Sequence, residues 1–90
     1  MKEIDQIIEA LLFASPDPLT QKKINSIFDK DPPDLKFHID KINDQYSKQN
    51  HGIEILYIAG GFQIRTKPDF DSYVRKLLNN SGQLYLLRLR

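Results

Sequence analysis

Cysteine is absent from the 90-residue sequence, and its absence excludes several kinds of chemistry at once. Disulfide bonds, catalysis by a thiolate and cysteine-based zinc sites all require this side chain. Long apolar runs are also missing, since none approaches the roughly 20 residues of a membrane-spanning helix. Acidic Glu3 and Asp5 interrupt the N-terminal segment, where a signal peptide would be continuously apolar. These absences favour a cytoplasmic protein.

An excess of either charge sign is missing as well. The sequence has 13 basic and 12 acidic residues, which gives a formal net charge of +1. Proteins that bind nucleic acids through phosphate contacts usually carry a clear basic excess or a one-sided basic face. A nucleic-acid interface in this chain would therefore have to come from local clustering. Hydrophobic residues make up 40% and charged residues 28%, a balance typical of one small, soluble globular domain.

Helical periodicity dominates the first half of the chain. In residues 2–14 the apolar positions recur at i, i+3, i+4, i+7 and i+8, which predicts an amphipathic helix. They are Ile4, Ile7, Ile8, Leu11 and Leu12, and the side expected to face water carries Glu3, Asp5, Gln6 and Glu9. Pro16 and Pro18 end this helix, because each proline disfavours helix in the residue before it. Thr20 is then expected to cap a short helix over residues 21–28.

A third helix is predicted to extend to about residue 49, with Asp31 as its N-cap and Pro32 at its first position. Gly52 is expected to adopt the left-handed conformation that ends many helices. The apolar positions of this helix share one face and are Leu35, Ile39, Ile42 and Tyr46. We expect that face to be buried.

The pattern then changes to that of a β-hairpin. Residues 53–59 and 62–66 read as strands, and Gly60 and Gly61 between them suit a type I′ turn. A two-residue loop here pairs Ala59 with Phe62 and places Glu54 across from Lys67. The face expected to pack on the core comprises Ile53, Ile55, Tyr57, Ala59, Phe62 and Ile64. The opposite face carries Glu54, Leu56, Ile58, Gln63 and Arg65.

A last helix opens at Pro68 and Asp69 and ends in residues 79–82. Its apolar residues repeat the spacing of the first helix and are Phe70, Tyr73, Val74, Leu77 and Leu78. The order helix, helix, helix, hairpin, helix is that of a winged helix-turn-helix domain. The predicted fold class is therefore mainly α with a two-stranded β-hairpin, and the domain is expected to span residues 1–82.

No constellation of residues points to catalysis, a metal or a cofactor. His38 and His51 lack a partner at metal-ligand spacing. The acidic residues between 29 and 34 lack the glycine and the closing glutamate of a calcium loop, so helix capping explains them better. Gly60 and Gly61 stand outside any phosphate-binding motif, and Ser15 and Ser81 outside any nucleophile motif. We expect no enzyme, no metal and no cofactor.

Nucleic-acid binding is the alternative function, because winged helices often place their third helix in the major groove. A winged-helix transcriptional regulator would use basic side chains of that helix and of the wing. The candidates are Lys36, Lys41, Lys48, Arg65 and Lys67. However, Asp34, Asp40 and Asp44 lie among the lysines of the third helix and would repel phosphates. We favour the interpretation that these basic residues are scattered on a soluble surface.

The outer face of the hairpin is a candidate partner or dimer contact. Leu56 and Ile58 point away from the predicted core, beside Gln63 and Arg65. Two interpretations stay open: the last helix covers these residues, or they form an exposed apolar patch for a partner or a second copy. The edges of a two-stranded sheet also offer a site for the addition of another strand.

Two stretches resemble the family of segregation and condensation protein B. Residues 7–20 read IIEALLFASPDPLT, where that family typically reads close to IEALLF.S..PL. Residues 52–68 read GIEILYIAGGFQIRTKP and are similar to the family's G.EL.EVAGGY.LRTKPE. Paired glycines followed by an aromatic residue and then RTKP are an uncommon combination. The likeness spans about residues 4–78.

This resemblance implies a cytoplasmic, nucleoid-associated scaffold without a cofactor. In that family the protein is a homodimeric subunit of the bacterial SMC–kleisin complex, which condenses and segregates chromosomes. Its partners would be the kleisin, segregation and condensation protein A, and the SMC ATPase, with direct DNA contact weak or absent and no membrane contact. The N-terminal winged-helix domains are associated with self-association, and a second domain makes much of the contact with the kleisin.

One departure from the family concerns the C-terminal segment. The family continues into a second domain that opens with a motif like LS..ALE.LAIIAY.QP, which QLYLLRLR in residues 83–90 does not fit. We therefore expect residues 83–90 to be a tail, the truncated start of a linker to that second domain. Kleisin binding by this chain alone is correspondingly in doubt.

Overall fold

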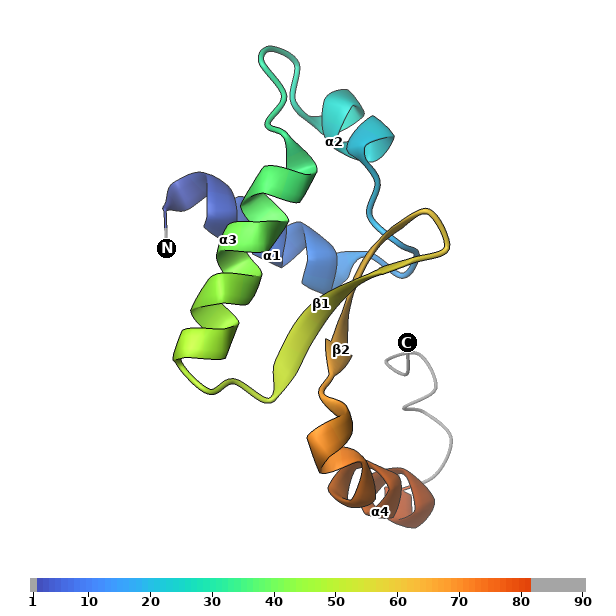
Figure 1. Ribbon diagram of the computed structural model, residues 1–90. Coiled ribbons are helices and arrows are strands. Elements are labelled where there is room, and N and C mark those ends of the chain that lie inside the picture. The colour runs from blue at the N-terminus through green and yellow to red at the C-terminus, as the bar shows by residue number, and fades with distance from the viewer. Residues whose placement is uncertain (1, 82–90) are drawn as a thin grey trace.

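Three helices, a hairpin and a final helix follow one another, which confirms the predicted winged-helix plan (Figure 1). The structure is a computed structural model that describes residues 2–81, so the expected tail at residues 83–90 lies outside the described part. The elements are α1 (Glu3–Ala14), α2 (Gln21–Ile27), α3 (Leu35–Lys48), β1 (Ile53–Ile58), β2 (Gly61–Thr66), the 3₁₀ turn η1 (Pro68–Phe70) and α4 (Asp71–Ser81). Helices α1 and α3 cross, and the hairpin packs against both of them.

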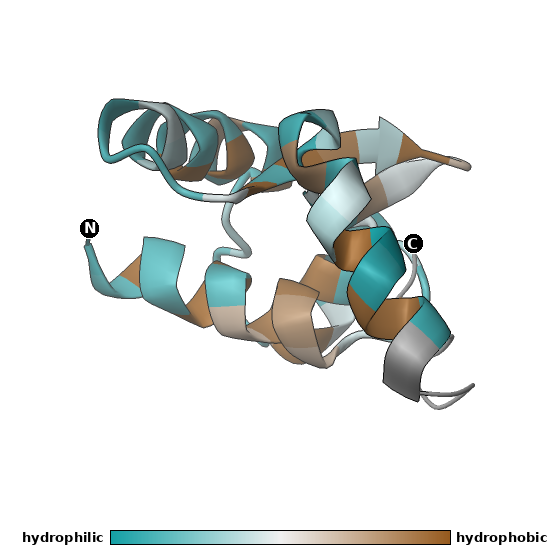
Figure 2. Cartoon of the chain, turned by 90° about the horizontal axis from the view of Figure 1, so that it is seen from below, coloured by the Kyte–Doolittle hydropathy of each residue, from teal (hydrophilic) through white to brown (hydrophobic). Residues whose placement is uncertain are grey.

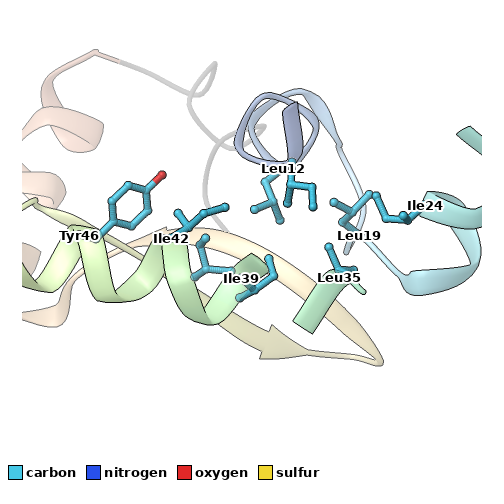
Figure 3. Packing of buried hydrophobic residues seen from close by; sticks show 9 residues of the cluster. Leu12, Leu19, Ile24, Leu35, Ile39, Ile42 and Tyr46 are labelled. Atoms are coloured by element: carbon cyan, nitrogen blue, oxygen red, sulfur yellow. The ribbon is translucent and has the colours of Figure 1, made fainter. Parts of the chain in front are cut away.

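The core lies at the crossing of α1 and α3 and continues towards α2 (Figure 3). All four residues predicted for the buried face of α3 are buried. The cluster of buried apolar side chains is Ile8, Leu12, Leu19, Ile24, Leu35, Ile39, Ile42, Tyr46 and Ile55. Each large aliphatic side chain that is fully buried stabilises the fold by roughly 1.5–3 kcal/mol. These residues therefore hold the hairpin and the three helices together as one unit.

The start of α3 differs from the prediction. The helix begins at Leu35 with Asp34 at its N-cap position, whereas Asp31 lies before it in the left-handed region with φ 49°. An N-cap residue needs extended backbone, so Asp31 cannot serve as one. The backbone N–H of Leu35 instead donates to Oε1 of Gln21, 2.7 Å away, so a side chain of α2 caps α3. At α2 itself the prediction is confirmed, because the Thr20 hydroxyl accepts from the N–H of Lys23.

The end of α3 also differs, since Asn50 and not Gly52 takes the left-handed conformation, with φ 55°. The N–H of His51 donates to the carbonyl of Tyr46 at 3.0 Å, which closes the helix in the manner of a Schellman motif. Asparagine tolerates this conformation better than other residues with a Cβ. Gly52 serves the hairpin instead, because its carbonyl accepts from the N–H of Lys67 at 2.9 Å.

The turn of the hairpin is one residue earlier than predicted. Ala59 and Gly60 form it, with φ 52° and 84°, the two positive values that a type I′ turn requires. Gly61 is already in β2 and pairs with Ile58, and Glu54 lies opposite Arg65 rather than Lys67. Each residue thus changes its partner by two positions, an even number. Both strands keep the side-chain faces that the sequence predicted.

Two residues of the predicted inner face lie outside the core, since Ala59 is exposed in the turn and Tyr57 precedes it on β1. Tyr57 is 68% exposed, although Ile55 on the same face is buried. Tyr57 is next to the turn, beyond the helices that cover the rest of the hairpin, and its ring contacts Phe62 across the strands at 5.2 Å between centroids. The inner face is therefore buried only at the end near the helices.

The register is determined by the loop that precedes α2. Leu19 and Phe62 exchange two backbone hydrogen bonds of 2.9 and 2.8 Å, which adds a short bridge to the edge of β2. A Cβ on Gly61 would lie 2.6 Å from Cβ of Pro18 and 2.9 Å from the carbonyl oxygen of Leu19. Only glycine permits this approach. Gly61 is thus required for close packing, and Gly60 for the turn.

We expect Gly61→Ala to destabilise the domain by about 2–3 kcal/mol, because the new methyl group collides with backbone and a proline ring. Gly60→Ala should cost only about 1 kcal/mol, since its Cβ would meet open space and only the positive φ is unfavourable. Urea unfolding followed by circular dichroism measures both. If both variants lowered the free energy of unfolding by the same amount, the contact between Gly61 and the Pro18–Leu19 loop would not constrain the hairpin.

Candidate interaction surfaces

The outer hairpin face consists of Leu56, Ile58, Gln63 and Arg65, which alternate with the inward residues along β1 and β2. Leu56 lies directly opposite Gln63 and is 39% exposed, and the other three residues are half-buried. Among the described elements, the close packing of α4 is with η1, and Leu56 keeps 39% of its surface exposed. An apolar side chain and a guanidinium are therefore available together on one strand face.

Arg65 carries an unsatisfied polar atom on this surface. Its Nε is buried and has no hydrogen-bond partner among the described residues. A buried donor without a partner costs roughly 1–3 kcal/mol. The outer hairpin face thus combines an exposed apolar side chain, Leu56, with the half-buried side chain of Arg65.

Both edges of the hairpin are partly blocked, β1 at its middle and β2 next to the turn, which limits the expected addition of another strand. On β1, the Asn43 side chain accepts from the N–H of Ile55 and donates to its carbonyl, both at 2.9 Å. On β2, Leu19 occupies the corresponding groups of Phe62. A third strand would have to displace one of these contacts. Partner binding through side chains of the outer face needs no such displacement.

The lysines of α3 are paired with acidic residues of the chain itself. Lys36 lies 2.9 Å from Asp40, Lys48 lies 3.0 Å from Asp44, and Lys41 lies 3.7 Å from Asp5. The first two pairs are exposed, so each contributes only about 0–1 kcal/mol. If a nucleic acid bound to α3, the carboxylates of Asp40 and Asp44 would come close to its phosphates together with the lysines, and they would repel those phosphates. Helix α3 therefore offers alternating charges and no continuous basic surface.

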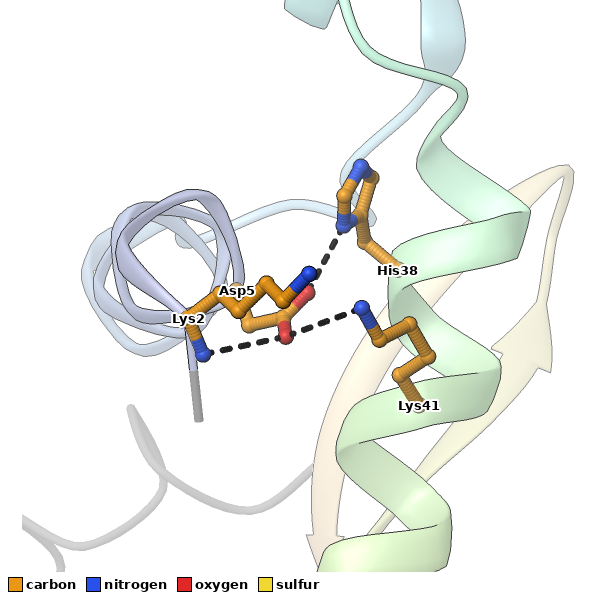
Figure 4. A network of polar contacts seen from close by, with 4 residues as sticks. All are labelled: Lys2, Asp5, His38 and Lys41. Carbon is orange, nitrogen blue, oxygen red and sulfur yellow. Dashed lines mark hydrogen bonds and ion pairs between the residues drawn. The ribbon is translucent and has the colours of Figure 1, made fainter.

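A buried carboxylate joins α1 to α3 (Figure 4). Asp5 was expected to face water but is only 3% exposed. Its oxygens accept from Nδ1 of His38 at 2.7 Å and from the backbone N–H of Lys2 at 3.4 Å, and Lys41 lies close by. No nucleophile belongs to this group, and every member binds a neighbouring element. The cluster is an anchor between two helices.

The environment of Asp5 favours its ionised form. Burial alone raises the pKa of the carboxyl, but the hydrogen bonds from His38 and Lys2 and the charge of Lys41 outweigh burial. The pKa of Asp5 is therefore below its ordinary value of 3.8. Because the folded pKa is below the unfolded one, the ionised carboxylate stabilises the fold above about pH 4, and this contribution is lost as the pH falls through the folded pKa.

We expect Asp5→Asn to lower the free energy of unfolding by about 1–3 kcal/mol at pH 7, because a charged acceptor is replaced by a neutral one. The difference between wild type and variant should shrink as the pH falls below about 4, where the wild-type carboxyl becomes protonated. Urea unfolding across this pH range measures it. Asp40→Asn, which removes an exposed partner of Lys36, is the matched control and should change stability by less than about 0.5 kcal/mol. A loss that is independent of pH would contradict the charge-based account.

A second polar contact links the same two helices. The Tyr46 hydroxyl donates to a carboxylate oxygen of Glu9. Burial, and then the neighbouring carboxylate, raise the pKa of Tyr46 above its ordinary value. Next to this contact is an open, mainly apolar groove of about 330 Å³, lined by Gln6, Glu9, Ala10, Phe13, Tyr46, Ile53 and Ile64. His51 contacts the Tyr46 ring and the Gln49 side chain and takes part in no further cluster within residues 2–81.

Two of these roles were not predicted from the sequence. Asp5 is in phase with Ile8 and Leu12, three and seven residues later, and this spacing is the signal that could have placed it on the buried side. Asn43 lies outside the apolar pattern of α3, and no pattern in the sequence indicates that its amide would contact the edge of β1. Within residues 2–81, no helix has both the length and the apolar character needed to cross a membrane.

The family model of the segregation and condensation complex subunit ScpB matches residues 6–87. Segregation and condensation protein B of Symbiobacterium thermophilum is 38% identical over 72 residues, which are 80% of this chain and 33% of that protein. The protein of the same name from Geobacillus thermodenitrificans is 36% identical over 77 residues, 84% of this chain and 37% of that protein. The chain thus spans little more than a third of the length of these curated relatives.

A solved structure covers the same region. The crystal structure of a dimer of the ScpB N-terminal domain complexed with ScpA peptide has a TM-score of 0.73 and 26% identity, over 91% of this chain and 95% of that one. The order of the helices and the hairpin agrees with the fold of this solved domain, and the family model matches residues 6–87, which is most of the sequence. This chain therefore belongs to the ScpB family of segregation and condensation complex subunits.

Proposed function

We propose that this chain is a non-catalytic scaffold subunit of a bacterial SMC–kleisin complex, acting in chromosome condensation and segregation. It works in the cytoplasm at the nucleoid, through homodimerisation and through contacts with the kleisin, segregation and condensation protein A. The family membership and the solved dimer of a similar domain with an ScpA peptide support this proposal. The single structural observation that carries it is the outer hairpin face, where Leu56 is exposed beside the half-buried side chain of Arg65.

Each residue of the outer hairpin face has a physical role in this proposal. Leu56 and Ile58 supply apolar area, which is the main favourable term in protein association. Arg65 and Gln63 supply donors that orient the partner, and arginine is enriched at protein interfaces. A partner that covers this face removes the exposed part of Leu56 from water, which favours the bound state.

A winged-helix DNA-binding regulator remains the alternative function. Its contacts would come from Lys36, Lys41, Lys48, Arg65 and Lys67. The acidic partners of the three lysines weaken this alternative, because they would bring like charge to the phosphates. Scaffold and regulator differ in one measurable respect, the dependence of DNA binding on salt.

Sedimentation velocity on the 90-residue chain tests the function. We expect a dimer that forms with rising concentration, leaves labelled random duplex DNA unshifted at low salt, and sediments together with a segment of the cognate kleisin. Co-sedimentation with the duplex that is lost as the salt concentration rises would instead support the regulator. A monomer that ignores both DNA and kleisin would contradict the scaffold role for this part of the protein.

Substitutions at the outer hairpin face test the site. Leu56→Asp and Ile58→Asp should each weaken self-association by about tenfold or more, because an unpaired charge would be buried at the contact. Circular dichroism should show the fold intact. Ile27→Asp is the matched control, since Ile27 is 51% exposed on α2, outside this face. Unchanged self-association in both hairpin variants would overturn the assignment of these residues.

A further inference from the structure

Helix α4 has an apolar stripe that the described part of the chain does not cover. The helix extends away from the crossing of α1 and α3, and its close contact is with η1 (Figure 1). In Figure 2, α4 is the helix nearest the viewer and carries apolar bands between hydrophilic ones. Phe70, the last residue of η1, and Tyr73 and Leu77 of α4 are 44%, 72% and 57% exposed. We call these three residues the α4 seam, since η1 leads directly into α4.

The spacing of the α4 seam is that of a helix that pairs with another helix. Its residues are three and then four positions apart, which is the alternation of core positions in coiled coils. An exposed row of large apolar side chains on a soluble protein marks an interaction site. The buried core described for residues 2–81 includes none of these three residues, although the Phe70 ring lies near Gly52.

The charges beside the seam indicate which partner fits it. Asp69 and Lys76 are seven residues apart, so they flank the same side of the seam. The ammonium of Lys76 lies 6.0 Å from the centre of the Tyr73 ring, which places this charge at the border of the apolar stripe. In an antiparallel pair of identical helices, equivalent flanks face each other. Asp69 of one copy would then lie near Lys76 of the other, twice in the dimer.

We propose that the α4 seams of two copies of this chain pack antiparallel against each other, with reciprocal ion pairs between Asp69 and Lys76. The partner of the α4 seam is a second copy of the chain. A seam bordered by one acidic and one basic residue is complementary to an identical seam only when the two helices are antiparallel. A parallel pair would place the same residues against the uncharged flank at Val74. This inference rests on the homodimerisation proposed above and adds a second contact to the outer hairpin face.

Charge reversal tests the arrangement, with sedimentation equilibrium at low salt as the measurement. Asp69→Lys and Lys76→Asp should each weaken the dimer by about tenfold, because two attractive pairs become repulsive. The double variant Asp69→Lys/Lys76→Asp should restore dimerisation to within about threefold of wild type. An equimolar mixture of the two single variants should form heterodimers, since both ion pairs are attractive again.

Matched controls lie one or two positions away on the opposite side of the helix. Arg75→Asp and Asp71→Lys make the same charge changes and should shift dimerisation by less than about twofold. If these controls weaken the dimer as much as the seam variants do, or if the double variant restores nothing, the antiparallel pairing is wrong. A wild-type dimer that no reversal affects would overturn the role of α4 and leave homodimerisation standing. A wild-type chain that stays monomeric at every concentration would overturn both.

Discussion

The approach of the Pro18–Leu19 loop to Gly61 and Phe62 is the contact on which the geometry of the wing depends. Two backbone hydrogen bonds and a missing Cβ bring the segments together, and they fix where β2 begins. A slip of one residue would turn every strand side chain to the other face. Ile55 would then leave the core, and Leu56 would enter it. The candidate surface therefore exists only because a loop far away in the sequence holds the hairpin in this register.

The hairpin in turn depends on how α1 lies across α3. Apolar contacts are not directional, so the buried isoleucines and leucines allow some sliding of one helix along the other. Hydrogen bonds are directional, and two of them join these helices: Asp5 with His38, and Glu9 with Tyr46. They determine which turns face each other. Asn43 then transmits the position of α3 to β1 through its two bonds with Ile55.

Patterns of period 3.6 and 2 predicted most of this fold, because they report burial along a single element. The buried face of α3, the cap at Thr20 and the alternation of side chains along both strands were predicted correctly, but Tyr57 and Ala59 of the predicted inner face are exposed. The turn was placed one residue too late, since two glycines offered two solutions and the deciding contact is with Pro18. The cap of α3 was also wrong, because Gln21 on another helix supplies it. Contacts between segments that are far apart in the sequence produce no periodic pattern of apolar residues. The contact of Gly61 with Pro18 and the cap from Gln21 therefore could not be predicted from the sequence.

The same distinction explains why the candidate surfaces could be only partly predicted. Alternation along β1 indicated that Leu56 points away from the core, but only the folded structure shows how much of it is exposed, 39%. The helical period of α4 predicted its apolar stripe and suggested a role in the core. Its exposure, however, follows from the extended backbone at Lys67, φ −71° and ψ 140°, which leads the chain away from the three-helix unit. Since the buried core described for residues 2–81 is built from elements that end at Thr66, that core does not account for the apolar residues after it.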